Sequence, residues 1–514
     1  MFKRRKVKST YKQMAFETAI RNPERYKGIL TAVNNFKGRK LDDSCLLEIV
    51  CNFYINGIVG SDEIKIDEQT TIENIKDKVI DVNSTRRADG GFPSGYQSRF
   101  WTYMRTLSEF GFVYARYGEI LKISEIAKKL INNEIDEQQA FTVQSMLCNR
   151  KSPYRNISND YNYFRFILEV LINLHNKNKA LSFNQFIVST FEKTGNVDEF
   201  IKLIDERHFT SDDDILLYIR EQEISERKIQ TMFSDYPDVV LRLLRITGFV
   251  TIESRGITFI RINEEKIELI KSLLNIEYVL SEQEKENPIL YYNKINNSFT
   301  PFLSLVKSHE DKDQIDGFEY LNKLENIIVS YNMDADKISE NIMQIGTRIS
   351  APEFKYIPEP LKLEFFISLL IYVKHGKEYA IRPNYKTDSL GMPTSHAPGN
   401  KGDIEIYSKT IYWLIEVTLI RNKTQQINSE TTSVIRHLLK SKEFEHHSPK
   451  YLSFVAPYIH YDTNTFYEFS IFKMNKEGEI AFIKPYTIKE FVEITNNKMN
   501  FNDMQKYTES YLTK

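Results

Sequence analysis

Residues 382–439 read RPNYKTDSLGMPTSHAPGNKGDIEIYSKTIYWLIEVTLIRNKTQQINSETTSVIRHLL. Within this stretch, residues 403–408 alternate between polar and apolar side chains, and residues 411–420 form an apolar run with one carboxylate, Glu416. Such runs, separated by a short polar turn, predict the two strands of a β-hairpin. Asp403 begins the first strand and Glu416 lies in the middle of the second, so the hairpin brings the two carboxylates close together.

A carboxylate inside an apolar strand is costly to bury unless it is paired or binds a metal ion. Because Mg²⁺ prefers oxygen ligands, Asp403 and Glu416 together predict a Mg²⁺ site. Alternatively, Asp403 merely ends a strand and Glu416 pairs with an arginine or lysine of the core. The presence of both acids favours the metal site. Glu405 shares the strand face of Asp403 and is either a further ligand or a solvated neighbour.

The composition indicates a multidomain protein. The chain has 514 residues, of which 41% are hydrophobic, enough for three or four domains. No run approaches the roughly 18 apolar residues of a membrane span, and the basic N-terminus lacks the apolar segment of a secretory signal. Cys45, Cys51 and Cys148 show neither metal spacing nor a disulfide framework, so we expect a cytoplasmic protein. The net charge of −1 does not exclude a nucleic-acid partner, because basic and acidic regions average out.

A similar order of predicted elements occurs twice in the N-terminal half. Residues 84–131 contain a polar loop, a helix, a β-hairpin after Gly111-Phe112-Val113, and another helix. Residues 238–273 repeat the order, with Gly248-Phe249-Val250 in the equivalent place. Helix, hairpin and helix is the order of a winged-helix module, and its recurrence predicts a tandem pair.

Arginines on these predicted modules are candidates for DNA contact, since arginine suits both guanine and phosphate. The candidates are two loop residues, two residues of the first recognition helix and two of the second helix: Arg86, Arg87, Arg99, Arg105, Arg242 and Arg245. Alternatively, these arginines are surface charges of packed helices. Winged helices also serve as protein–protein modules, and the second copy could be mainly structural.

A change of composition after residue 280 and a strong helix after residue 350 predict the domain boundaries. The expected parts are two winged-helix recognition subdomains, a helical linker and an α/β domain, at 1–150, 151–280, 281–350 and 351–514. In the last part we expect a helix carrying Glu364, the acidic hairpin, a helix, a strand at 451–459 and another strand at 469–474. This order is typical of a restriction-endonuclease-like α/β core behind a mainly α N-terminal region.

The order Glu364, Asp403, Glu416, Glu430, with HAPGNKGDIEIY and LIEVTLIRNKTQQINSETTSVIRHL, resembles the AlwI-type family of type IIS restriction endonucleases and their nicking relatives. The resemblance implies a C-terminal PD-(D/E)xK nuclease domain and cleavage at a fixed distance from a short asymmetric site. By position, Asp403 matches the metal-binding aspartate and Glu416 the second acid of the motif. Glu364 matches the upstream helical glutamate, and Glu430 matches the later one.

One position departs from the general nuclease motif. The lysine expected two residues after the second acid is Thr418 in this chain. The general base is therefore unassigned, with a metal-bound water, Glu430 and a nearby lysine or glutamine such as Gln426 as candidates. His396 and His437 could carry a proton, although a structural role is the favoured interpretation of both.

The combined hypothesis is a Mg²⁺-dependent, sequence-specific endonuclease acting on double-stranded DNA. One acidic cluster cuts one strand, so a double-strand break needs a transient homodimer or a small catalytic subunit, and without either the protein nicks. We also expect a cognate methyltransferase in the same system. The alternatives are a non-catalytic winged-helix DNA-binding protein and a nuclease subunit of a mobile element.

Overall fold

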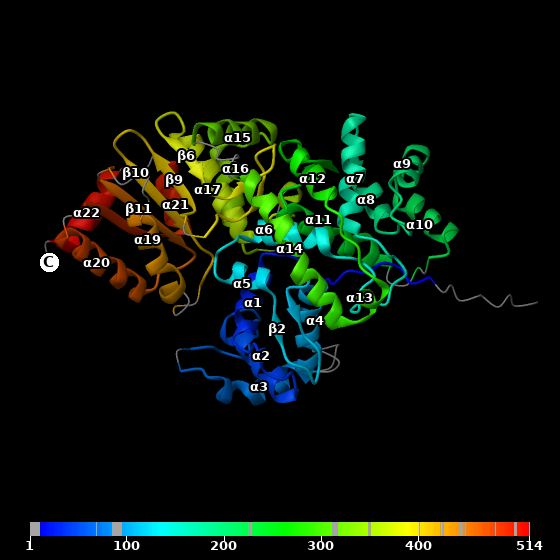
Figure 1. The fold of residues 1–514 in the computed structure, drawn as a ribbon. Helices are drawn as coiled ribbons and strands as arrows, with labels where there is room; N and C mark the ends of the chain where they lie inside the picture. The colour runs from blue at the N-terminus through cyan, green and yellow to red at the C-terminus, as the bar shows by residue number, and fades with distance from the viewer. Residues whose placement is uncertain are drawn as a thin grey trace, which may run out of the picture. The chain divides into compact units, whose positions relative to one another are not determined.

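The chain forms two compact units, Met1–Lys312 and Asp313–Lys514, in the computed structural model (Figure 1). The structure describes residues 11–512 apart from 68, 85–94, 225, 227–228, 311–316, 348–350, 400, 422, 424–425, 441–445, 448, 478–479 and 498–500. The side chains at 317–318, 428–430, 440, 475 and 511–512 are also outside the described part. The predicted linker, 281–350, contributes helices to both units, and the four predicted domain ranges stay a prediction. None of the described helices is long and apolar enough to cross a membrane.

The first half of unit 1 is helical around a small hairpin. Its elements are α1 (Arg25–Asn34), α2 (Asp43–Ile55), α3 (Ile72–Ser84), α4 (Gly95–Glu109), β1 (Val113–Tyr114), β2 (Lys122–Ile123), α5 (Glu125–Ile131) and α6 (Glu137–Leu147). β1 pairs antiparallel with β2, Val113 opposite Ile123. The predicted order of helix, hairpin and helix is therefore present at α4–β1–β2–α5.

The second half of unit 1 repeats this order with a longer hairpin. Its elements are α7 (Tyr163–Asn176), β3 (Leu181–Ser182), α8 (Phe183–Ser189), α9 (Val197–Glu206), α10 (Asp212–Glu221), η2 (Thr231–Asp235), α11 (Tyr236–Ile246), β4 (Val250–Arg255), β5 (Ile257–Ile262), η3 (Glu264–Lys266), α12 (Ile267–Leu274), α13 (Glu282–Glu286) and α14 (Pro288–Glu310). β5 lies between β3 and β4, and all pairings are antiparallel. The predicted order recurs here, with the short η3 before α12; whether either copy is a winged helix stays a prediction.

Glycine explains why the same tripeptide follows both helices. Gly111 and Gly248 have φ of +68° and +70°, a backbone conformation in which side chains are disfavoured. An added Cβ would also lie 2.6 Å from Cγ2 of Ile295 at the first position, and 2.4 Å from Nε2 of Gln138 at the second. Each glycine therefore permits both the end of its helix and a close contact with α14 or α6.

Unit 2 contains a five-stranded mixed sheet. Its elements are α15 (Gly317–Ser330), α16 (Ala335–Gln344), η4 (Pro352–Phe354), α17 (Glu359–His375), β6 (Ala380–Pro383), β7 (Lys386–Thr387), β8 (Pro393–Ser395), β9 (Ile404–Tyr407), β10 (Tyr412–Val417), η5 (Gln426–Thr431), α19 (Thr432–Lys440), β11 (Lys450–Ala456), α20 (Tyr461–Lys476), β12 (Ala481–Thr487), α21 (Ile488–Asn496) and α22 (Phe501–Leu512). The strand order is β12-β11-β10-β9-β6. β10, β11 and β12 run parallel, and β9 is antiparallel to both β10 and β6. The predicted hairpin is thus β9–β10, and the strand predicted at 451–459 is β11.

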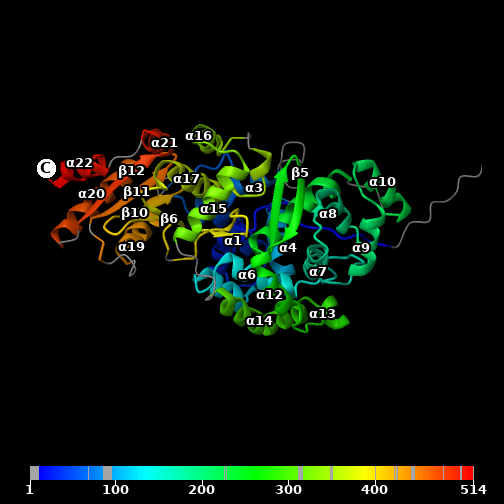
Figure 2. The same cartoon turned by 90° about the horizontal axis from the view of Figure 1, so that it is seen from above.

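Helices cover both faces of this sheet. Trp413 and Ile415 belong to a core cluster with side chains of α17 and α21, whereas Leu414 belongs to a second cluster with side chains of α19 and α20. In Figure 2, α21 and α19 accordingly lie on opposite sides of the sheet. Because side chains alternate along β10, Glu416 faces the same side as Leu414, toward α19.

The strand predicted at 469–474 is wrong, because these residues lie within α20. Thr463, Tyr467, Ser470, Ile471 and Met474 are buried, at the spacing of three and four residues that one helix face requires. A window as short as FSIFKM does not reveal that period, and the last strand of the sheet is β12 instead.

Candidate functional site

The acidic pair lies at one end of the β9–β10 hairpin. Ile404 is opposite Ile415 and Glu405 is opposite Leu414, and the same antiparallel register brings Asp403 opposite Glu416. Oδ2 of Asp403 accepts a hydrogen bond from the backbone N–H of Val417 at 2.8 Å. Directly opposed residues of an antiparallel pair point to the same face. The continued register thus places Asp403 and Glu416 side by side at the end of the hairpin, and their joint role in binding a metal stays a prediction.

Glu416 is 5% exposed and has a histidine partner. Nδ1 of His437, in α19, lies 2.7 Å from Oε1 of Glu416. An added Cβ at Gly402 would lie 2.9 Å from the same carboxylate oxygen and 2.3 Å from Cδ1 of Leu414, so the backbone closely approaches the acid here. The sequence did not single out this pairing, although the position of His437 on the helix after the hairpin was a usable signal.

Glu405 is not a solvated neighbour, because it is buried and engaged by other side chains. Its carboxylate accepts hydrogen bonds from Nη2 and Nε of Arg382 at 2.6 and 3.0 Å, from Nδ2 of Asn384 at 3.0 Å and from the hydroxyl of Tyr412 at 3.1 Å. Burial, followed by the charge of Glu405, raises the pKa of Tyr412 well above its ordinary value, so this phenol stays a neutral donor. These contacts hold Glu405 in a structural role.

Glu364 lies in α17, which packs on the opposite face of the sheet from α19. The residue is 5% exposed, and Nδ1 of His396 lies 2.6 Å from its Oε1. Its other oxygen, Oε2, is buried and has no hydrogen-bond partner in the described part of the chain. A buried oxygen of this kind calls for a ligand such as water or a cation.

The contacts of Glu430, Thr418 and Gln426 do not identify a general base. The backbone of Glu430 lies in η5, but its side chain is outside the described residues. Thr418, in place of the lysine, is buried at the end of β10, and its backbone N–H donates to the carbonyl of Val455 at 2.9 Å. Gln426 is fully buried, donates to the carbonyl of Tyr458 at 3.0 Å and accepts from Thr463 at 2.7 Å, an arrangement typical of a structural amide.

The donor chemistry of the hairpin fits a hard divalent cation. Asp403 and Glu416 offer opposed carboxylates, and oxygen ligands of this type suit Mg²⁺. Among the side chains that the structure describes, which omit Glu430, no group of three or more His, Cys, Asp and Glu is arranged to hold a metal ion. The described residues therefore supply two neighbouring carboxylates on the hairpin, and the participation of Glu364 stays a prediction.

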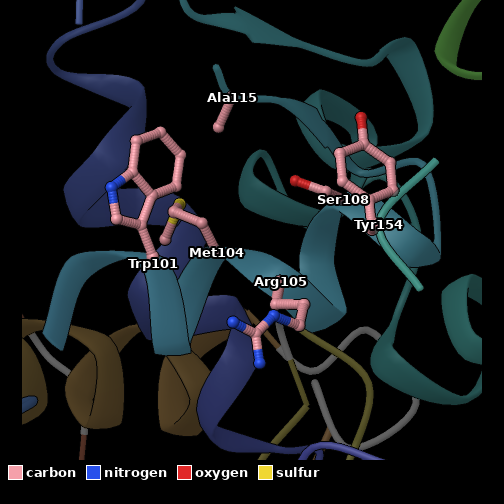
Figure 3. A pocket seen from close by; sticks show the side chains of 6 residues that line it. All are labelled: Trp101, Met104, Arg105, Ser108, Ala115 and Tyr154. Atoms are coloured by element: carbon pink, nitrogen blue, oxygen red, sulfur yellow. The ribbon is translucent and has the colours of Figure 1, made fainter. Parts of the chain in front are cut away.

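Two of the predicted DNA-contact residues, Arg86 and Arg87, lie outside the described residues. Arg99 donates to Oδ1 of Asn83 and lies 5.8 Å from the ring centroid of Tyr54. Arg105 has a side chain that is 43% exposed and donates to Oε2 of Glu17 at 2.9 Å. It also lines a pocket of about 190 Å³, together with Trp101, Met104, Ser108, Ala115 and Tyr154 (Figure 3).

Arg242 and Arg245 of α11 are paired within unit 1. Arg242, 12% exposed at its side chain, donates to Asp238 at 3.0 Å and to Oδ1 of Asn22 at 2.7 Å. Arg245 is 3% exposed and pairs with Glu24. A base contact by either residue would require the separation of these pairs, and the predicted role of both in DNA contact remains a prediction.

Three restriction-enzyme structures are among the solved structures to which this chain is similar. The match to the small subunit of the heterodimeric restriction endonuclease R.BspD6I covers 35% of this chain and 96% of that subunit. The sequence identity is 22% and the TM-score is 0.26. The match to the BpuJ1 endonuclease binding domain, solved in complex with modified DNA, covers 55% of this chain and 90% of that domain. The sequence identity is 14% and the TM-score is 0.32. The match to restriction endonuclease FokI covers 97% of this chain and 98% of FokI, with a sequence identity of 10% and a TM-score of 0.26. TM-scores this low do not support a functional assignment.

Comparison with known sequences is more decisive. No curated protein matches the chain. The family model described as AlwI restriction endonuclease matches two segments, 108–345 and 294–494. Because the two segments together extend over most of both units, the chain belongs to the AlwI restriction endonuclease family.

Proposed function

We propose that this DNA endonuclease is a type IIS enzyme that hydrolyses a phosphodiester with Mg²⁺, at a fixed distance from a short asymmetric site. Its family membership gives the general activity, and the finer assignment rests on one observation. Asp403 and Glu416 are opposed on one face of the β9–β10 hairpin, with His437 against Glu416. Glu405, the neighbouring acid of β9, is engaged by Arg382 instead.

In this proposal Asp403 and Glu416 hold the cation, with Glu364 and Glu430 completing the site. Mg²⁺ bound there would neutralise charge on the scissile phosphate and lower the pKa of a water molecule. His437 keeps the carboxylate of Glu416 in its orientation through the 2.7 Å contact between Nδ1 and Oε1. Partners in this outer position commonly fix the geometry of metal-binding side chains.

The proposed recognition region is unit 1, with α4 of the first helix–hairpin–helix module facing DNA. Arg86, Arg87, Arg99 and Arg105 are its proposed contacts, reading base edges and holding phosphates. The exposed guanidinium of Arg105 supports this role. Arg242 and Arg245 would join these contacts only by giving up their present partners, so we propose mainly structural roles for them.

Cleavage of both strands requires a second catalytic domain, because one acidic cluster cuts one strand. We propose a transient homodimer or a small catalytic subunit as its source, and nicking where neither is available. A cognate methyltransferase would protect the host site.

The proposal is tested by incubating the full chain with mixed-sequence plasmid DNA and Mg²⁺, and then sequencing the product ends. We expect cuts at a constant offset from one short sequence, and none with EDTA. Asp403→Ala and Glu416→Ala should each abolish cleavage and retain specific DNA binding in a gel-shift assay. Cuts inside the bound sequence would refute the type IIS assignment, and cleavage by both variants would refute the assignment of the site.

A further inference from the structure

The segment that leads into the acidic hairpin also carries the partner of Glu364. We propose that His396 is a positioning residue, which holds Oε1 of Glu364 so that Oε2 is directed at the bound cation. This inference rests on the proposed function and deepens it.

The contact between the two side chains is short and shielded from water. Nδ1 of His396 lies 2.6 Å from Oε1 of Glu364, and the exposed fractions of the two side chains are 27% and 6%. The imidazole is thus partly open to solvent, whereas the carboxylate is enclosed. In such surroundings a hydrogen bond restricts a carboxylate more strongly than it does in water.

The other oxygen of Glu364 supports a role in binding. Oε2 is buried and has no hydrogen-bond partner among the described residues, and the same holds for Oγ of Ser395, the residue before His396. Buried polar atoms are usually paired, so Oε2 of Glu364 is open to a ligand such as water or a cation. One oxygen held by His396 and one left unsatisfied is the arrangement expected of an acid that awaits a ligand.

The route of the chain connects this acid with the hairpin. After His396, the segment continues to Gly402 and Asp403, whose carbonyl oxygens accept hydrogen bonds from Asn384 at 2.7 and 2.9 Å. One anchored segment therefore carries both the partner of Glu364 and the first acid of the hairpin. Glu364 belongs to α17 on the opposite face of the sheet, so His396 provides a link between an acid on that face and the metal-binding end of β9.

The matched variants are His396→Asn and His396→Ala. Asparagine retains an N–H donor close to the position of Nδ1, whereas alanine removes the donor. If the alanine variant does not fold, His396→Gln is a second disruptive variant, because its amide donor lies one carbon further from the backbone. For each full-length protein, the Mg²⁺ concentration for half-maximal cleavage and the maximal rate are measured. Cation affinity is measured separately by Tb³⁺ luminescence without DNA.

We expect His396→Ala to weaken cation binding by about 10–100-fold in both measurements, as loss of an outer partner does, and His396→Asn to stay within about threefold of the wild type. In a Glu364→Gln background the alanine change should have no further effect, because the pair acts through that carboxylate. Unchanged cation affinity in His396→Ala, or equal losses in the alanine and asparagine variants, would overturn the inference. Failure of the wild type to cleave with any divalent cation would instead overturn the proposed function.

Discussion

Two acids on the same face of one strand segment should respond to neutralisation in opposite ways. Asp403 and Glu405 are two residues apart, and each can be replaced by its amide with little change of shape. Asp403 faces Glu416 across the hairpin, whereas Glu405 is engaged by Arg382. We therefore expect Asp403→Asn to reduce the cleavage rate without loss of stability, and Glu405→Gln to reduce stability with much of the activity retained.

The expected loss of cleavage rate in Asp403→Asn follows from the lost charge. The amide oxygen can still accept the hydrogen bond from Val417, so the end of the strand should keep its structure. Charge stabilisation by a bound cation is worth several kcal/mol in the transition state. A loss of about 4 kcal/mol corresponds to about a thousandfold in rate.

The expected loss of stability in Glu405→Gln follows from the partly buried ion pair between Arg382 and Glu405. The side chains of Arg382 and Glu405 are 15% and 7% exposed, so removal of the carboxylate leaves a guanidinium in poorly solvated surroundings. Breaking such a pair costs about 3 kcal/mol or more. For a unit of this size, each kcal/mol lowers Tm by roughly 2–4 °C, which gives a decrease of about 6–12 °C.

The assay compares single-turnover cleavage, at a temperature well below both transitions, with calorimetric unfolding of the same preparations. We expect the Asp403 variant to lose at least about a thousandfold in rate at an unchanged Tm, and the Glu405 variant to stay within about tenfold in rate. If neutralising Glu405 abolished cleavage and left Tm unchanged, its assignment as a structural residue would be refuted. Full activity of the Asp403 variant would remove that residue from the catalytic site.

Three further changes test other features. Gly402→Ala should reduce cleavage by at least about tenfold and lower the free energy of unfolding by about 1–3 kcal/mol, because its Cβ would overlap a side chain of β10 and a carboxylate; rates and denaturant unfolding measure both effects. Arg245→Met should destabilise unit 1 by about 3–5 kcal/mol by leaving a buried carboxylate unpaired, yet gel-shift affinity for DNA below the transition should be unchanged if the arginine is structural. Burial raises the pKa of the Cys51 and Cys148 thiols to about 12. Between about pH 8.5 and about pH 12 the thiols of the unfolded chain lose protons that the folded chain retains, so the free energy of unfolding should decrease as pH rises. Maleimide labelling of these cysteines in the native protein should also be slow.

The hairpin was predictable because its signal is local. An alternating run, a two-residue turn and an apolar run specify both strands and their register, and register alone brings Asp403 and Glu416 together. The family motif also named Glu364. Residues 469–474 show the limit of such local reasoning, because six residues do not distinguish a buried helix face from a strand.

Partners that come from distant segments were not predictable. Nothing nearby in the sequence indicates Glu24 as the partner of Arg245, whereas Asp238, a partner of Arg242, lies only four residues away. Glu405 was likewise ambiguous until the fold brought β6 beside β9, with Arg382 opposite Glu405 in register. An acid or arginine acquires its role from the charge that the fold places against it, and for Arg245 and Glu405 that charge lies well outside any local window.

The topology of unit 2 explains why the candidate site lies where it does. β10, β11 and β12 are parallel and β9 is antiparallel to β10, so the first residues of β9 meet the carboxyl ends of the parallel strands. The segments that continue into α19 and α20 leave the sheet at this same end. In open α/β sheets, ligands bind outside the carboxyl ends of the strands, because connecting segments there can vary without disturbing the core. Asp403, Glu416 and the segment leading to His437 therefore converge because of strand direction.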